Sequence, residues 1–187
     1  YLARDKSGEK PLYITCGKNF FAFSSDLISL KNIPSFKKSI NQNALEKYLQ
    51  YNYIPCPLTI YNNTFKLPSA SFLTIDLNKF IYHDYKTFYD LVSSNGVKLT
   101  NWWKSSITKK DDIPDEFKKY DQTKSFIKKL LKKSVENQLL SDAPLGAFLS
   151  SGIDSSLIVS IMKDLKKDPQ TFTIGFENPD YDESRDA

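Results

Sequence analysis

Cysteine and histidine are scarce in this chain of 187 residues, which contains two cysteines and one histidine. Cys16 and Cys56 are far apart and belong to no CxxC motif, so neither a zinc site nor a disulfide framework is predicted. With His83 as the single histidine, a histidine-based metal site is also disfavoured. Unpaired cysteines are typical of a reducing compartment, and we expect a cytoplasmic protein.

Long apolar runs are missing too. No stretch approaches the ~20 apolar residues that a membrane helix needs, and no signal peptide precedes residues 2–8. The net charge of +4 comes almost wholly from lysine, because arginine occurs only at Arg4 and Arg185. Dispersed lysines usually solvate a surface, so we expect neither a membrane nor a nucleic acid as a partner.

The remaining composition, with 40% hydrophobic and 26% charged residues, is typical of a globular protein with one domain or two small ones. Tyr1 stands where an initiator methionine is usual, and Ala187 falls in what reads as the middle of an element. We therefore expect both ends to be cut and the chain to be a fragment of a longer protein.

Hydrophobic periodicity predicts an α/β chain with an α+β first half. The pattern decays over residues 87–119, which predicts domains at 1–90 and 121–187 joined by a linker at 91–120. Ser24 or Ser25 is predicted to cap the first helix. The expected elements are strands at 12–15, 20–23, 65–76, 145–149 and 171–176, and helices at 25–30, 42–51, 123–140 and 154–165.

The stretch LGAFLSSGIDSS at residues 145–156 carries the clearest chemical signal. An apolar run suited to a buried strand breaks at a turn of serines and Gly152, whose missing Cβ permits backbone angles closed to other residues. Apolar residues at helical spacing follow. A strand that enters a helix through such a turn directs several backbone N–H groups at one point, which suits an anion.

Asp154 would repel a phosphate at this place, and a Mg²⁺ ion bridging the carboxylate and phosphate oxygens explains its presence. The loop is not a Walker A sequence, because the spacing and the lysine of that motif are missing. The alternative is an ordinary strand-to-helix turn in which Asp154 and the serines cap the helix. The residues of the loop leave both interpretations open.

A second apolar segment, TFTIGF at residues 171–176, predicts another buried strand after the loop helix. Strand, helix and strand over this length form a βαβ unit, which implies a parallel sheet. Ligands of such sheets bind beyond the carboxyl ends of the strands, where the loop lies. The acids of NPDYDESRDA at 178–187 either assist a metal or form a polar turn that leads into a helix.

These segments resemble a known family. SDAPLGAFLSSGIDSSLI and TFTIGFENPDYDESRDA resemble the ATP-pyrophosphatase loop region of glutamine-hydrolysing asparagine synthetases. RDKSGEKPLYI, FAFSSDLISL, ALEKYLQYNYIPCPLTIY and KLPSASFLTID resemble the later half of the glutaminase domain of that family. Only residues 85–121 lack a clear counterpart. The resemblance implies the carboxyl-terminal half of an Ntn-hydrolase-type glutaminase domain, followed by the first βαβ unit of a parallel-sheet ATP-pyrophosphatase domain.

The family's activity follows as an expectation. The resemblance implies a ligase that hydrolyses glutamine, passes ammonia through an internal tunnel, and activates aspartate with ATP and Mg²⁺ as an acyl-adenylate, which ammonia converts to the amide. Glutamine, aspartate and ATP are then the small-molecule substrates, and a homodimer is one expected form. The ATP and pyrophosphate site implied by the resemblance comprises Leu149, Ser150, Ser151, Gly152, Ile153, Asp154, Ser155, Ser156 and Ile174, with Asp154 directed toward Mg²⁺.

The chain departs from the family pattern in two places. Ser151 stands where the family usually has a first glycine, and Asp26 replaces a glutamate. Neither Cys16 nor Cys56 can be the family's amino-terminal nucleophile, because an internal cysteine has no free α-amine to act as its base. We therefore expect the fragment alone to be inactive. The alternatives are an amidotransferase for another carboxylate, on a surface sugar or a secondary metabolite, and a non-catalytic nucleotide-binding protein.

Overall fold

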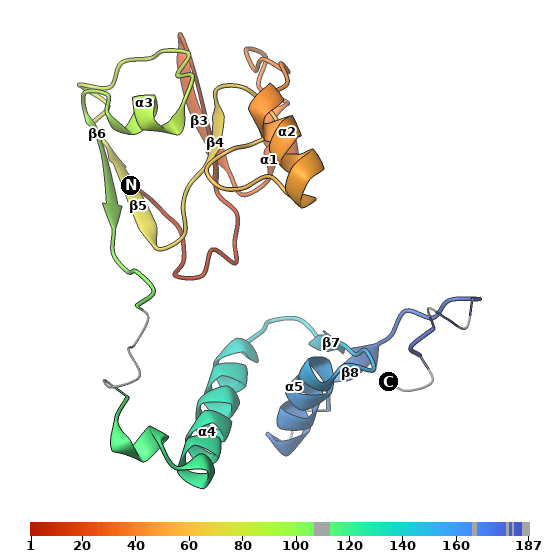
Figure 1. The fold of residues 1–187 in the computed structure, drawn as a ribbon. Coiled ribbons are helices and arrows are strands. Elements are labelled where there is room, and N and C mark those ends of the chain that lie inside the picture. Colours follow the sequence, from red (N-terminus) through yellow and green to blue (C-terminus); the bar gives the residue numbers. More distant parts are fainter. Residues whose placement is uncertain (107–112, 166–167, 179, 181, 185–187) are drawn as a thin grey trace. The chain divides into compact units, whose positions relative to one another are not determined.

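The computed structural model describes residues 1–106, 113–165, 168–178, 180 and 182–184 (Figure 1). The chain divides into two compact units, Tyr1–Ser106 and Ile107–Ala187. Residues 107–112 of the predicted linker and residues 179, 181 and 185–187 of the predicted polar turn lie outside the described residues. Among the described residues, no helix has the length and apolar character required to cross a membrane.

The first unit contains two antiparallel sheets of three strands each (Figure 1). One sheet has the order β3-β2-β4, and the pairing of β2 with β3 confirms the hairpin predicted by the two apolar segments. The other sheet has the order β1-β5-β6. The strands are β1 Leu2–Ala3, β2 Tyr13–Gly17, β3 Phe20–Ser24, β4 Thr64–Lys66, β5 Ser71–Ile75 and β6 Val97–Asn101.

The second sheet extends into the segment assigned to the linker. β6 pairs with β5 over its whole length, with Leu99 opposite Leu73. Helix α3, Phe88–Val92, precedes it and begins with a capping box between Thr87 and Asp90. Both elements are short, and strand formation depends strongly on the neighbouring strand, so the local pattern did not reveal them. The domain bounds 1–90, 91–120 and 121–187 otherwise stay a prediction.

Both sheets contribute to one hydrophobic core. Leu73 of β5 and Ile14 of β2 are fully buried, and Leu91 of α3 joins them. The turn after β1 is held by Arg4, whose guanidinium donates to the carbonyl oxygens of Leu67, Gly8 and Lys10 at 2.7, 2.7 and 2.9 Å. The remaining members of the core are Leu2, Cys16, Phe65, Leu67, Phe80 and Tyr85.

Two helices of the first unit begin at polar caps. The carboxylate of Asp26 accepts the backbone N–H groups of Ile28 and Ser29, so Asp26 is the N-cap of α1, Leu27–Leu30. The prediction of Ser24 or Ser25 as the cap was wrong, because the chain turns into the helix one residue later. Asn41 caps α2, Gln42–Tyr51, and confirms the helix predicted there.

The second unit contains a βαβ arrangement packed on a long helix. Strands β7, Gly146–Phe148, and β8, Gln170–Phe172, pair in parallel, and helix α5, Ile153–Asp164, connects them. The 3-10 helix η2, Asp115–Phe117, leads into α4, Tyr120–Gln138. Helix α4 contacts α5, and Val135, Ile161 and Met162 form the core between them. The unit is therefore mixed α/β.

The strands of this unit are less buried than predicted. The side chain of Phe148 is 83% exposed and that of Phe172 is 55% exposed. In the described residues, β7 and β8 pair only with each other. The side chain of Ala147 packs against the small core that α4 and α5 form. A buried parallel strand needs cover on both faces, which these two strands lack within the described part of the chain.

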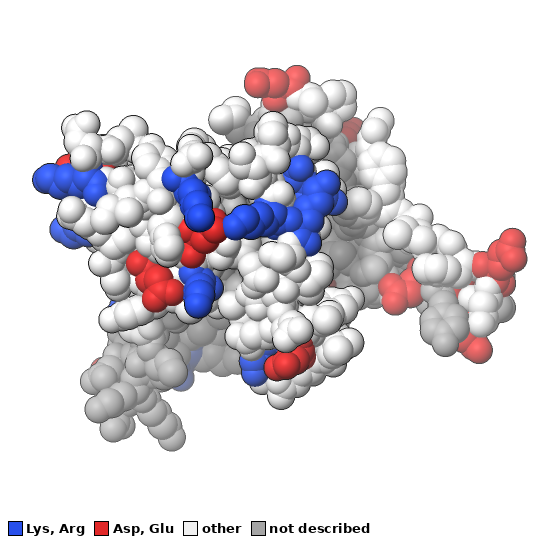
Figure 2. All heavy atoms as spheres, turned by 90° about the horizontal axis from the view of Figure 1, so that it is seen from above, with Lys and Arg blue, Asp and Glu red and all other residues white. Residues whose placement is uncertain are grey.

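The lysines are spread among other side chains. In the view of Figure 2, basic side chains lie beside acidic ones and are surrounded by uncharged residues. Several lysines take part in ion pairs, as between Lys37 and Asp84 at 2.6 Å and between Lys133 and Glu136 at 3.3 Å. Such exposed pairs mainly solvate the surface. The expected lack of nucleic-acid binding stays a prediction.

Candidate functional site

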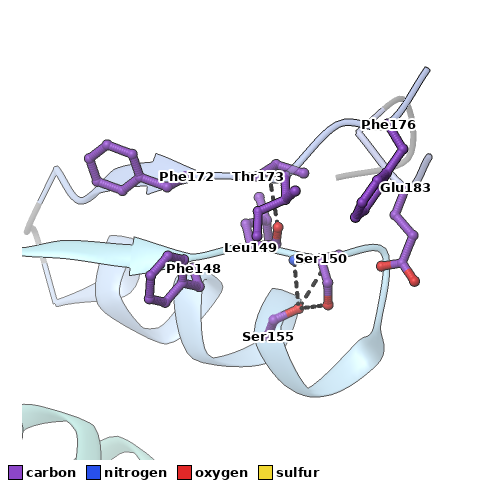
Figure 3. A pocket seen from close by; sticks show the side chains of 9 residues that line it. Phe148, Leu149, Ser150, Ser155, Phe172, Thr173, Phe176 and Glu183 are labelled. Atoms are coloured by element: carbon purple, nitrogen blue, oxygen red, sulfur yellow. Dashed lines mark hydrogen bonds between the residues drawn. The ribbon is translucent and has the colours of Figure 1, made fainter. Parts of the chain in front are cut away.

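The loop between β7 and α5 begins as a continuation of the parallel pairing. The Leu149 N–H donates to the Phe172 carbonyl oxygen at 2.9 Å, and the Thr173 hydroxyl donates to the Leu149 carbonyl oxygen at 2.9 Å. These bonds hold the first residue after β7 beside the first residue after β8 (Figure 3). The loop therefore leaves the sheet from a fixed position at the carboxyl end of both strands.

The turn into the helix has ordinary backbone angles. Gly152 is the N-cap of α5 with φ −70° and ψ 147°, which residues with a Cβ also adopt. The prediction that this glycine supplies unusual angles was wrong. A Cβ here would meet only the Ser150 hydroxyl, at 3.2 Å. Among the described residues, non-glycine positions with positive φ are Asn52, Asn63 and Ala70, so Ser151 fits its place without backbone strain.

A hydroxyl pair closes the loop. The Ser155 hydroxyl lies 2.9 Å from the Ser150 hydroxyl and accepts the Ser150 N–H at 3.2 Å (Figure 3). It also has two acceptors for its single proton, the carbonyl oxygens of Ser150 at 3.1 Å and Gly152 at 3.0 Å. Ser155 is half-buried. The first turn of α5 is thus tied to the end of β7.

The start of α5 presents backbone donors. No side chain in the described residues caps this helix, because its N-cap is Gly152. The first N–H groups of a helix lack acceptors within the helix, and they carry its positive dipole end. The amides of the first turn are therefore directed toward the space before the helix, as the anion-binding prediction requires. This arrangement also weakens the alternative of a turn capped by Asp154, because the Asp154 carboxylate makes no cap bond.

One loop amide already contacts an anionic group. The Ser151 N–H donates to Oε2 of Glu183 at 3.3 Å. Glu183 belongs to the chain segment after β8, and no local pattern connects it with Ser151. The Glu183 carboxylate oxygen thus occupies the acceptor position at the Ser151 N–H, where a phosphate oxygen could bind instead.

Asp154 lies exposed in the first turn of α5. Among the described residues, no group of three or more histidine, cysteine, aspartate or glutamate side chains is arranged to hold a metal ion. The chain therefore presents no metal site made of protein ligands alone in its described part. A single carboxylate still fits Mg²⁺, because this ion usually combines one or two carboxylates with phosphate oxygens and waters.

A cavity of about 390 Å³ opens beside the loop. Of the predicted site residues, it brings together Leu149, Ser150, Ser155 and Ile174. Ser156 instead lines a second cavity with Leu149, and its hydroxyl donates to the Gly152 carbonyl oxygen at 2.9 Å. The first cavity is completed by residues that the sequence analysis missed, which are Phe148, Phe172, Thr173, Phe176 and Glu183 (Figure 3).

The signal for most of these missed residues was present in the sequence. Phe148 immediately precedes the predicted Leu149, and Thr173 and Phe176 belong to the same apolar segment as Ile174. Residues two apart share a face of an extended segment, so Phe176 follows from Ile174, whereas Phe148 and Thr173 are found only as direct neighbours of Leu149 and Ile174 along the chain. The remaining predicted residues, Ser151, Gly152, Ile153 and Asp154, lie in the turn and the helix start without lining the cavity.

Neither cysteine is part of this site. Cys16 belongs to β2 and is buried in the core of the first unit, and burial raises the pKa of its thiol to about 12. Cys56 is exposed and lies 3.3 Å from the Lys66 carbonyl oxygen, and partial desolvation raises the pKa of its thiol as well. Both thiols are therefore poor sources of a thiolate nucleophile at neutral pH.

Two family comparisons cover most of the chain. Residues 1–86 match the glutamine amidotransferase domain family, and residues 127–187 match the asparagine synthase family. Curated proteins named as glutamine-hydrolysing asparagine synthetases align with almost the whole chain. These matches fit a fragment of a glutamine-hydrolysing asparagine synthetase.

Three of the similar proteins come from different organisms. A putative asparagine synthetase [glutamine-hydrolyzing] 2 of Methanocaldococcus jannaschii is 38% identical over 192 residues, which cover 98% of this chain and 32% of the relative. Asparagine synthetase [glutamine-hydrolyzing] 1 of Bacillus subtilis is 31% identical over 183 residues, covering 98% of this chain and 25% of the relative. A putative asparagine synthetase [glutamine-hydrolyzing] of Mycobacterium tuberculosis is 30% identical over 188 residues, covering 98% of this chain and 26% of the relative.

The chain thus spans a third or less of these curated asparagine synthetases. The asparagine synthase match includes α5, β7, β8 and the loop between β7 and α5. The glutamine amidotransferase match ends before α3. Elements α3, β6 and η2 therefore lie between the two matched segments of this chain.

Proposed function

We propose that the whole protein is a glutamine-hydrolysing ligase that forms asparagine from aspartate through an acyl-adenylate. The observation that carries this proposal is the uncapped start of α5 beside the cavity, in the segment that matches the asparagine synthase family. The relatives are named as glutamine-hydrolysing asparagine synthetases, and a glutamine amidotransferase match precedes this segment. Ammonia released in the first domain is then used in the second.

The loop fits the pyrophosphate end of ATP. The first N–H groups of α5 and the hydroxyl of Ser150 offer donors to phosphate oxygens, while Leu149 and Ile174 offer apolar surface to the rest of the nucleotide. Ser155 holds the loop against β7, so these donors keep their positions during the reaction. Mg²⁺, held by Asp154 and the phosphates, would neutralise negative charge on the leaving pyrophosphate.

At the level of fold, we propose that the two antiparallel sheets of the first unit belong to an Ntn-hydrolase-type glutaminase domain. The parallel pair β7 and β8 is proposed to be the start of a larger parallel sheet. The homodimer, the cytoplasmic location and the inactivity of the 187-residue chain by itself stay predictions.

An assay of the whole protein with glutamine, ATP and a carboxylic acid tests the proposal. We expect AMP, pyrophosphate and asparagine when aspartate is supplied, with glutamine as the nitrogen donor. AMP formation with another acid, and none with aspartate, would show a related amidotransferase for a different carboxylate. Absence of AMP formation with every acid, together with absence of glutaminase activity, would favour a non-catalytic nucleotide-binding protein.

A further inference from the structure

A carboxylate from the segment after β8 covers part of the loop. Glu183 accepts the Ser151 N–H and lines the cavity next to Phe176 (Figure 3). The separation of Ser151 and Glu183 along the chain is 32 residues. Glu183, which follows β8 in the chain, therefore lies next to the loop.

Asp182 holds this part of the chain. One of its carboxylate oxygens accepts the N–H groups of Phe176 at 3.4 Å and Ser184 at 3.1 Å. Hydrogen bonds from the Ser184 side chain and backbone lower the pKa of Asp182, so its acceptor remains charged at neutral pH. The anchor fixes the residue next to it, Glu183, in front of Ser151.

Two carboxylates lie close to the loop in the described part of the chain. Asp154 lies in the first turn of α5, and Glu183 contacts the residue before Gly152. No lysine or arginine is among the residues that line the cavity in the described part of the chain. A free nucleoside triphosphate carries several negative charges and is repelled by these carboxylates. Bound Mg²⁺ lowers the net charge of the nucleotide and gives the carboxylates a cation to contact.

We propose that Glu183 makes this site selective for metal-complexed ATP over the free ATP anion. A phosphate oxygen can take the Ser151 N–H only after the carboxylate of Glu183 has moved away from it. Free ATP must displace this carboxylate against like-charge repulsion. Metal-complexed ATP carries less negative charge, and so meets less of that repulsion. Glu183 is thus a specificity-determining residue, and this inference rests on the proposed function because it assumes ATP at the loop.

Calorimetric titration of the whole protein with ATP tests the selectivity. The dissociation constant is measured once with Mg²⁺ and once with a chelator in place of the metal. We expect Glu183→Gln to strengthen binding of free ATP about fivefold, equivalent to removal of one exposed charge interaction of ~1 kcal/mol. Binding of the Mg²⁺ complex should change much less. The ratio of the two constants, the dissociation constant of free ATP divided by that of Mg²⁺-ATP, therefore falls.

Glu177→Gln is the matched control, since Glu177 is exposed on the same segment and does not line the cavity. This variant should keep the wild-type ratio. Asp182→Ala, which releases the anchor, should lower the ratio as Glu183→Gln does. Circular dichroism verifies that each variant retains its secondary structure.

The outcomes separate the two proposals. If the wild-type protein binds Mg²⁺-ATP but Glu183→Gln keeps the wild-type ratio, the selectivity proposal is overturned while the proposed function stands. An equal fall in both glutamate variants also overturns it, because a general charge effect then explains the result. A lower ratio caused only by weaker binding of Mg²⁺-ATP overturns the repulsive role. A wild-type protein that binds ATP under neither condition overturns both proposals.

Discussion

The hydroxyl of Ser155 lies within hydrogen-bonding distance of three atoms of Ser150, the backbone nitrogen at 3.2 Å, the carbonyl oxygen at 3.1 Å and the hydroxyl at 2.9 Å. Ser155 is in the first turn of α5, and Ser150 follows β7. A single side chain therefore connects the strand and the helix on either side of the loop. The position of the helix amides relative to the sheet depends on this connection.

Ser155→Ala should loosen the loop and weaken ATP binding. The substitution leaves the Ser150 N–H without this acceptor, and the expected loss of stability around β7 and α5 is about 1 kcal/mol. Hydrogen exchange of the amides in these two elements measures the loss. Ser156→Ala is the control, because the Ser156 hydroxyl bonds only within the start of α5. Equal exchange in the two variants would contradict the connecting role of Ser155.

Asp154→Asn should suppress ATP cleavage in the whole protein. The substitution keeps the size of the side chain but removes the charge expected to hold Mg²⁺ beside the phosphates. We expect pyrophosphate release to fall by at least about tenfold, as for loss of one electrostatic contact to the reacting groups. Glutaminase activity should be largely retained. Pyrophosphate release at the wild-type rate in this variant would show that the metal role of Asp154 is wrong.

Gly146→Ala should disturb the pairing of β7 with β8. A Cβ at this position would lie 2.6 Å from the ring of Phe172 and 3.1 Å from the Gln170 carbonyl oxygen. The expected loss of stability is about 1 kcal/mol, at the low end for overpacking, because the ring of Phe172 is 55% exposed and is able to move. Hydrogen exchange of the strand amides measures it.

A double-mutant cycle provides the control for Gly146→Ala. The cost of the substitution should be smaller in a Phe172→Ala background, since the ring supplies the closer of the two contacts. If the cost is the same in both backgrounds, the contact with Phe172 is not its cause.

The two thiols should react at different rates with iodoacetamide at pH 8. Cys56 is exposed, whereas Cys16 is buried and its pKa is raised to about 12. Thiolate is the reactive form, so Cys56 should be alkylated first and Cys16 only after unfolding. Mass spectrometry of peptides from the labelled chain distinguishes them. Similar alkylation of both thiols in the folded chain would contradict the burial of Cys16.

Asp5 should make the stability of the first unit depend on acid pH. Its carboxylate accepts the N–H groups of Glu9 and Lys10, and these bonds lower its pKa below the ordinary value of 3.8. The bonds therefore stabilise the folded state above pH 3.8, and this contribution disappears as pH falls through the lowered pKa. Asp5→Asn should be less stable than the wild type at neutral pH, with the difference closing at low pH.

Urea titrations followed by tryptophan fluorescence measure this effect, because Trp102 and Trp103 both belong to the first unit. Asp154→Asn is the control, since Asp154 belongs to the second unit. Parallel pH profiles for the wild type and Asp5→Asn would contradict the role of Asp5.

Local sequence patterns were sufficient for the elements whose stability is mainly local. The apolar stripe before the loop predicted a helix at 123–140, and α4 spans Tyr120–Gln138. The loop helix, predicted at 154–165, is α5 at Ile153–Asp164. Helical periodicity is repeated over several turns, so an error of a few residues at the ends does not hide it.

Tertiary contacts decided the features that no local pattern encodes. β6 forms because it pairs with β5. The local sequence pattern instead assigns these residues to the linker predicted at 91–120. Phe148 belongs to an apolar run that is typical of a buried strand, yet its side chain is exposed. The reason is that β7 has no covering layer in the described part of the chain. Strand pairing and burial are properties of neighbours in space, which spacing along the chain does not report.

The loop at residues 145–156 combines both kinds of information. Its small residues between a strand and a helix were enough to predict a turn that directs backbone amides at an anion. The contact of Ser151 with Glu183 became visible only in three dimensions, because the segment after β8 returns to the loop from 32 residues away. Short-range geometry follows from residue type, whereas the closure of long chain segments depends on how the whole unit packs.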